Sequence, residues 1–459
     1  MTELDLLPRH RPLTTRAQWT GFAGAAALVL VTSGLPVPPV VVLALGLTGM
    51  GVVVLAWLDL GRHAGTIGVR RLYLIAATWC VPLLAARPLF SGDVYCYLAQ
   101  GTVADLGFDP YRLGPAAALG ADSPVTKLVS VYWQDTPAPY GPAFVELSRV
   151  IAHFAGQNVV ATVLSHRLVE LAGVALIAWA LPRLARRTGA APSTAVWLGL
   201  LNPLVLWHVV AGVHTDGLLM GLLLAGLEIA LSGRVAAGVV VLTVAANIKF
   251  VAVAAVCFLA VELARRATRA RDRVAVVFGV AAGFLLVSTV IAAGTGLGFG
   301  RFAAVGSPAQ VHSWLAPTNQ LGFLIGGLAG TSLTDAAIRT CVWAGAVIGA
   351  GVAVKLLWSV FHGRFRVVQG VGLVFAAMLV TGPVVQPWYL LWTVLPLAAC
   401  VRTGRARWAL AGLSAVVALL LPPAGGSPVV LFAGYLTAVF LMGGVLLLPR
   451  TRRPAPVPG

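Results

Sequence analysis

The sequence is poor in charged residues, which make up only 10% of its 459 positions. Soluble domains average about 25% charged residues, so this composition excludes a water-soluble globule and an intrinsically disordered chain. Only three lysines are present, and the formal net charge of +17 comes from arginines that cluster between apolar runs. That distribution excludes a nucleic-acid-binding protein and favours a helical protein that crosses a membrane many times.

Cysteine is also scarce. The five cysteines are scattered and have no CxxC spacing, which predicts neither a disulfide framework nor a metal–thiolate site. The glycine-rich string at 294–298 lacks the strand–turn–helix context of a dinucleotide site, so we expect no nucleotide cofactor.

Long apolar runs dominate what remains. We predict an all-α transmembrane bundle of about 13–14 spans in one domain over 19–448, after a short N-terminal segment 1–18 and before a basic, proline-rich tail 449–459. The stretch 235–262 is too long for one ordinary span and has a polar centre, so we expect two short helices that meet near Lys249. The other spans are expected near 19–34, 39–58, 72–88, 158–181, 192–208, 214–232, 274–293, 337–360, 367–383, 387–401, 408–421 and 429–448.

The basic residues orient this layout. Of the 32 lysines and arginines, 23 fall on one side, which the positive-inside rule makes cytoplasmic. We therefore expect a multi-pass protein of the plasma membrane with both termini in the cytoplasm. Two long segments, 89–157 and 294–336, then lie outside, and the first carries six of the fifteen acidic residues. Loops of this length are uncommon unless they are functional.

The first outer segment opens with a candidate catalytic carboxylate. Gly92 breaks the preceding span directly before Asp93. A partly desolvated carboxylate just outside the hydrocarbon is well placed to act as a general base. Asp93 could instead be an ordinary N-cap of the short interfacial helix that we expect over 94–106. Asp109 and Pro110 predict the turn that closes this helix.

Several polar residues could meet an anionic substrate. His214 and Asp216 lie at the outer turn between two spans, with no third metal ligand spaced nearby, and a helix that starts there would attract a phosphate. Lys249, at a helix break inside the membrane, is costly unless it meets an anion. Arg301 and His312, on the second outer loop, are further candidate phosphate ligands, although such residues can also snorkel to the interface.

Aromatic residues accompany these candidates. Tyr95, Tyr140, Trp388 and Tyr389, together with Gln386, could line a substrate groove, or they could belong to the aromatic belt found at every membrane interface.

One further pair of charges lies inside a predicted span. Arg167 and Glu170 are three residues apart, so we expect them to pair along one helix face. The other candidates all map to the non-cytoplasmic half, which predicts an outward-facing cavity with one base and several cations.

Three segments carry a resemblance to a known family. They are SGDVYCYLAQGTVADLGFDPY at 91–111, YWQDTPAPYGPAF at 132–144 and NPLVLWHVVAGVHTDGLLMGLLLAG at 202–226. These resemble the polyprenyl-phosphomannose-dependent α-1,6-mannosyltransferases of actinobacteria, in particular the MptB-like branch.

This resemblance implies a glycosyltransferase of the GT-C fold, with Asp93 as its catalytic base. The implied donor is polyprenyl-phosphate-mannose, and the implied acceptor is a growing mannan on a phosphatidylinositol-mannoside-type glycolipid, as in lipomannan and lipoarabinomannan assembly. It implies no metal and no other cofactor. Two alternatives stay open, namely a GT-C transferase of another sugar such as arabinose or glucose, or of mannose to protein, and a flippase or transporter of lipid-linked sugars. A transporter should show an inverted repeat, and the sequence shows none.

Overall fold

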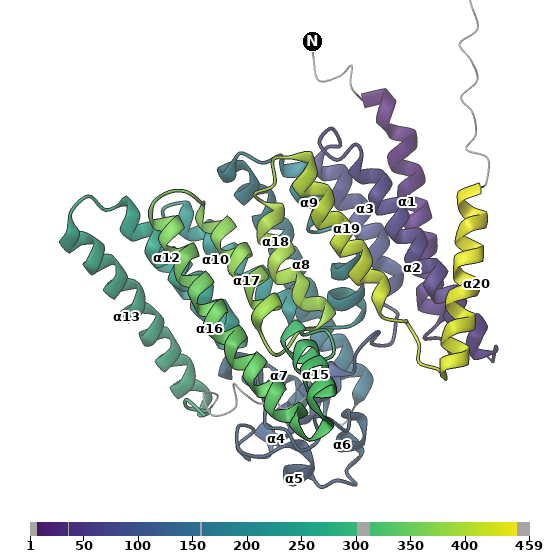
Figure 1. Cartoon of the computed structure of the whole chain (residues 1–459), viewed down its shortest axis with the longest axis horizontal. Coiled ribbons are helices and arrows are strands. Elements are labelled where there is room, and N and C mark those ends of the chain that lie inside the picture. Colours follow the sequence, from purple (N-terminus) through teal and green to yellow (C-terminus); the bar gives the residue numbers. More distant parts are fainter. Residues whose placement is uncertain (1–6, 35, 157, 301–312, 448–459) are drawn as a thin grey trace, which may run out of the picture.

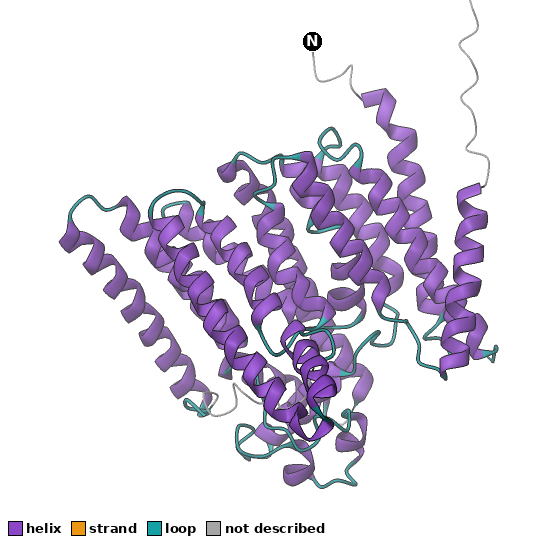
Figure 2. Ribbon diagram, in the orientation of Figure 1, coloured by secondary structure: helices purple, strands orange, loops and turns teal. Residues whose placement is uncertain are grey.

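The computed structural model describes residues 7–34, 36–156, 158–300 and 313–447, and every regular element in these ranges is a helix. Figure 2 shows this helical architecture, which confirms the predicted all-α class. The longer helices are α1 (Leu7–Leu30), α2 (Pro39–Gly61), α3 (Val69–Leu83), α8 (Val159–Thr188), α10 (Asp216–Leu231), α11 (Val235–Ile248), α12 (Val253–Arg266), α13 (Ala270–Thr295), α16 (Thr334–Phe361), α17 (Val367–Thr381), α19 (Gly404–Leu420) and α20 (Pro428–Leu447).

Five further helices of the described chain cluster at one end of the bundle. They are α4 (Asp93–Asp105), α5 (Pro115–Leu119), α6 (Pro124–Leu128), α7 (Pro142–Ala155) and α15 (Pro317–Ala329). In Figure 1 they lie in the lower part of the view, whereas α1 begins and α20 ends toward the upper side. Helix α4 confirms the helix predicted over 94–106. Interfacial helices in the two large outer loops were expected, but the sequence analysis gave no bounds for the other four.

Some of these helices can span a membrane. Four of the described helices are long and apolar enough to cross a membrane, namely Pro39–Gly61, Val159–Thr188, Ala270–Thr295 and Thr331–Phe361. A fifth results if the π-helix η2 (Val205–Ala211) and α10, bent by 109° at their junction, form one broken span. Val235–Ile248, Val367–Thr381 and Pro428–Gly444 are shorter apolar helices. The chain is therefore a polytopic membrane protein.

Fewer helices meet this length test than the 13–14 predicted spans, because several of those spans form short helices. Helix α18 (Leu390–Ala398) has nine residues. At about 1.5 Å per residue it is about 14 Å long, well short of a hydrocarbon core of about 30 Å. It packs as a buried element of the bundle, as does α9 (Pro192–Leu198).

The break inside the long apolar stretch 235–262 lies where the sequence predicts it. Helix α11 ends at Ile248, Lys249 has an extended backbone, and a short 3-10 turn (Phe250–Ala252) leads into α12. The break also receives the outer loop, because Gly141 N donates to Ile248 O at 2.8 Å. A Cβ atom on Gly141 would lie 2.1 Å from Asn247 O, so only glycine allows this approach.

A contact between glycines brings two central helices together. A Cβ atom on Gly173 of α8 would lie 2.4 Å from the backbone of Gly217, and one on Gly221 of α10 would lie 2.4 Å from Gly173 O. Small residues allow helix backbones to approach closely inside a membrane. This crossing places the first turn of α10, with Asp216, directly against the buried polar residues of α8.

Candidate active site

Asp93 is the first residue of α4 and does not cap it. The N-cap position is Gly92, and no side chain caps this helix. The Ser91 hydroxyl donates to Asp93 Oδ1 at 2.7 Å, and Asp93 N donates back to Ser91 Oγ at 3.1 Å. His214 Nδ1 lies 3.4 Å from Asp93 Oδ2. Both carboxylate oxygens are thus held by neighbouring side chains, which contradicts the N-cap interpretation.

The surroundings of Asp93 keep its carboxylate ionised. Burial alone would raise its pKa, but the contact with His214, the Ser91 hydroxyl and the charge of Lys249 outweigh that effect, so the pKa lies below its usual value. Helix α4 is not one of the spanning helices, and the Asp93 side chain is 23% exposed. A reacting hydroxyl can therefore reach an ionised carboxylate here.

A second carboxylate lies close by and has a full cation as its partner. Lys249 Nζ lies 3.1 and 3.2 Å from the two carboxylate oxygens of Asp216, and Trp392 Nε1 donates to Asp216 Oδ1 at 2.6 Å. The ammonium also lies over the rings of Tyr389 and Trp392, 4.5 and 5.0 Å from their centroids. Lys249 does meet an anion, as the sequence predicts, but in this structure that anion is Asp216.

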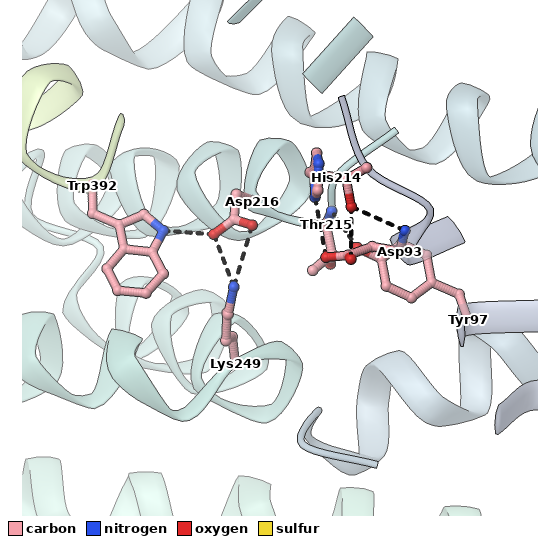
Figure 3. A network of polar contacts seen from close by, with 8 residues as sticks. Asp93, Tyr97, His214, Thr215, Asp216, Lys249 and Trp392 are labelled. Atoms are coloured by element: carbon pink, nitrogen blue, oxygen red, sulfur yellow. Dashed lines mark hydrogen bonds and ion pairs between the residues drawn. The ribbon is translucent and has the colours of Figure 1, made fainter. Parts of the chain in front are cut away.

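The two carboxylates are tied to one tripeptide. His214 and Asp216 flank Thr215 at the start of α10, and Figure 3 shows His214 directed at Asp93 and Asp216 directed at Lys249 and Trp392. Thr215 N donates to the Tyr97 hydroxyl at 3.3 Å. The Tyr97 ring packs edge-on against Tyr140, with centroids 5.3 Å apart. Helix α4, the outer loop and the bend before α10 therefore converge on one place.

Several of the predicted groove residues take part in this convergence. Trp388 stacks on His214 with ring centroids 3.8 Å apart, and Tyr389 stacks on Trp392 at 4.0 Å. Gln386 opens the 3-10 turn that presents both rings, since its carbonyl accepts the Tyr389 N–H at 3.0 Å. Tyr95 packs half-buried against the apolar cluster around Tyr97.

Comparison with known proteins identifies the family. Residues 15–265, more than half of the chain, match the N-terminal domain of the alpha-(1->6)-mannopyranosyltransferases, and residues 317–448 match the MptB C-terminal domain. The chain belongs to this family. Membership makes it an enzyme of mannosyl transfer and confirms the resemblance found in the sequence.

Three relatives are similar along most of the enzyme. A probable alpha-(1->6)-mannopyranosyltransferase of Mycolicibacterium smegmatis is 38% identical, covering 90% of this chain and 81% of the relative. An alpha-(1->6)-mannopyranosyltransferase of Mycobacterium tuberculosis is 35% identical, covering 84% of this chain and 75% of the relative. Alpha-(1->6)-mannopyranosyltransferase A of the same species is 36% identical, covering 82% of this chain and 75% of the relative. No solved structure matches the enzyme.

Two predicted site residues, Arg301 and His312, lie outside the described residues. Within the described ranges, no three His, Cys, Asp or Glu side chains gather closely enough to hold a metal ion.

The predicted pair of Arg167 and Glu170 is wrong. Glu170 Oε2 accepts the backbone N–H of Leu218 at 2.9 Å, and the Arg167 guanidinium binds backbone carbonyls. The spacing of three residues allows a pair. Backbone groups left without a partner where neighbouring helices begin or end bind the two side chains instead.

Sequence reasoning also missed Ser91, Tyr97 and Trp392 as members of the site. Ser91 could have been found, because a serine hydroxyl commonly accepts the backbone N–H two residues later, which here is that of Asp93. Tyr97 and Trp392 meet their partners 118 and 176 residues away, which no local pattern indicates.

Proposed function

We propose that the enzyme transfers mannose from polyprenyl-phosphate-mannose to a lipid-linked α-1,6-mannan, by a single inverting displacement at the outer membrane face. The observation that carries this proposal is the ionised, reachable carboxylate of Asp93, held by Ser91 and His214. Family membership supplies the reaction class. Our proposal adds the donor, the acceptor and the role in lipomannan and lipoarabinomannan assembly.

In this mechanism the acceptor 6-hydroxyl attacks the anomeric carbon while Asp93 takes its proton. The bond from the anomeric carbon to the phosphate oxygen breaks, and the electron pair leaves with the lipid phosphate. Because the phosphate is already a stable anion, no general acid is needed, unlike in glycoside hydrolysis. Inversion converts a β-linked donor into an α-mannoside.

The leaving phosphate needs cations or hydrogen-bond donors nearby. An ammonium has three N–H groups, so Lys249 can hold the two Asp216 oxygens and still donate to a phosphate. We therefore keep Lys249 as a proposed phosphate ligand, together with Arg301 and His312. The structure does not support this part for His214, because its side chain is fully buried between Asp93 and Trp388, and we propose instead that it holds Asp93. The part of Asp216 is indirect, since a carboxylate repels phosphate and here holds Lys249 in place.

The proposed orientation puts both termini in the cytoplasm of a cell whose plasma membrane holds the enzyme. It is supported by the arginine-rich loops and by the arrangement in Figure 1, where the helices around Asp93 lie opposite the start of α1 and the end of α20.

The test is transfer by the purified enzyme in detergent, with radiolabelled polyprenyl-phosphate-mannose and a short synthetic α-1,6-mannoside. A general base contributes about 10²–10⁴-fold, so Asp93→Asn should lower kcat by about 100-fold or more. Asp105→Asn, at the other end of α4 and paired with the exposed His153, is the matched control and should keep wild-type turnover. We expect EDTA to leave the rate unchanged.

Two outcomes would contradict the proposal. Retention of a tenth of the wild-type rate by Asp93→Asn would remove Asp93 as the base. No product from wild type, together with transfer from an arabinose donor or movement of the donor lipid across vesicles, would point to another sugar or to a transporter.

A further inference from the structure

Two irregular chain segments bring the proposed base and its histidine together. One follows α3 and runs to Asp93, and the other follows η2 and runs to His214. They lie against each other, since a Cβ atom on Gly212 would be 2.9 Å from Leu89 O. Neither segment can hold its shape through regular secondary structure.

Each segment also contains a strained residue directly ahead of the site. Phe90 has φ of 68° and Val213 has φ of 59°, and no other non-glycine residue of the described chain has a positive φ. A positive φ is unusual for a bulky or β-branched residue and is unfavourable in free energy. Such conformations persist only where surrounding contacts impose them.

Arg167 of α8 supplies contacts of this kind to both segments. Its Nη1 donates to Leu84 O at 2.6 Å and its Nη2 to Ala86 O at 2.7 Å, on the way to Asp93. Its Nε donates to Val210 O at 3.1 Å and its Nη2 to Ala211 O at 3.3 Å, which are the last two residues of η2, directly before the segment that leads to His214. Arg167 is 3% exposed, so these bonds are shielded from water.

We propose that Arg167 is a positioning residue that fixes the Asp93 segment against the His214 segment, so that the two side chains meet. The planar guanidinium has five N–H donors in a rigid fork, which allows one side chain to hold carbonyls of both segments at once. A lysine is a point charge with three donors and cannot reproduce this geometry. The catalytic part of this inference rests on the proposed function.

The first test does not depend on catalysis. His214 is fully buried and should react slowly with diethyl pyrocarbonate, followed by mass spectrometry. In Arg167→Met the two segments separate more readily, so modification of His214 should be faster, with Arg167→Lys in between. Arg187→Met is the matched control, because Arg187 pairs with Glu228 at the other end of the same helix. Equal protection of His214 in wild type and Arg167→Met would overturn the proposal.

The second test asks whether Arg167 acts through His214. A misplacement of about 1 Å can cost about 100-fold, so Arg167→Met should lower kcat on that order while the KM for the donor changes little. Arg187→Met should keep the wild-type kcat. In a double-mutant cycle, adding Arg167→Met to His214→Ala should cost little more than His214→Ala alone. Additive losses would show that Arg167 acts elsewhere, whereas absence of transfer by wild type would count against the proposed function and leave the modification test valid.

Discussion

Replacing Lys249 with methionine removes the cation of a buried ion pair and leaves the Asp216 carboxylate behind. The Asp216 side chain is 1% exposed and the Lys249 side chain 16%, so water cannot replace the lost partner. Trp392 Nε1 would still donate to Asp216 Oδ1, but one neutral hydrogen bond does not compensate a buried charge. The same change also deletes one proposed phosphate ligand, and the two effects can be separated.

The expected loss of stability follows from the burial. Removing one partner of a buried ion pair costs about 3–5 kcal/mol. Unfolding entropy is about 2.1 cal/mol/K per residue, which gives about 1 kcal/mol/K for 459 residues. Lys249→Met should therefore lower Tm by about 3–5 °C. The double variant Lys249→Met with Asp216→Asn should recover most of this loss, because an amide is neutral and its oxygen still accepts from Trp392.

The assay is thermal unfolding in detergent, measured beside the KM for the lipid donor. Lys355→Met, the same substitution at an exposed position of α16, is the control and should melt like wild type. If Lys249 also binds the phosphate, the donor KM should rise in both Lys249 variants, including the one whose stability is restored. A wild-type Tm for Lys249→Met would refute the ion-pair reasoning, and an unchanged KM would remove the phosphate role.

Two further changes test how the site is held. Ser91→Ala removes a hydrogen-bond donor that lowers the pKa of Asp93, so this pKa should rise. Because only the ionised carboxylate accepts a proton, the acid limb of the kcat/KM profile should move to higher pH. An acid limb at the wild-type pH would contradict the contact between Ser91 and Asp93. Gly141→Ala places a Cβ atom 2.1 Å from Asn247 O and should cost about 1–3 kcal/mol of stability. Gly327→Ala, which has open space around the new Cβ atom, is the control and should cost nothing. Equal melting temperatures of the two variants would show that the outer loop does not dock as described.

The parts of the fold that could be predicted are those that local chemistry decides. Lys249 and Asn247 interrupt an apolar run, and the break between α11 and α12 lies there. Gly92 ends one segment and α4 begins at the next residue. Prolines and glycines also bound the outer helices that were missed, such as α7 at Pro142, but short helices lack the long apolar period that makes a span visible.

The pairings inside the site could not be predicted in the same way. Lys249 was expected to need an anion, and the cost of an isolated charge in the membrane explains why that expectation was sound. Its partner Asp216 is 33 residues away, and Trp392 is 176 residues from Asp216. Only the folded bundle brings these residues together. Arg167 and Glu170 show the converse, since two neighbours with opposite charge turned to separate backbone partners.

The two carboxylates of the site explain why only one of them can serve as a base. Asp216 is 1% exposed, and its oxygens are directed at the Lys249 ammonium and an indole N–H, so a hydroxyl cannot approach it. Asp93 is held by a serine hydroxyl and a histidine, and a quarter of its side chain is open. The tripeptide at 214–216 separates these environments, because His214 faces Asp93 whereas Asp216 faces Lys249 and Trp392 (Figure 3). The sharp bend between η2 and α10 thus gives the two carboxylates different roles. In our proposal Asp93 is the accessible base, and Asp216 holds Lys249 beside the reacting phosphate.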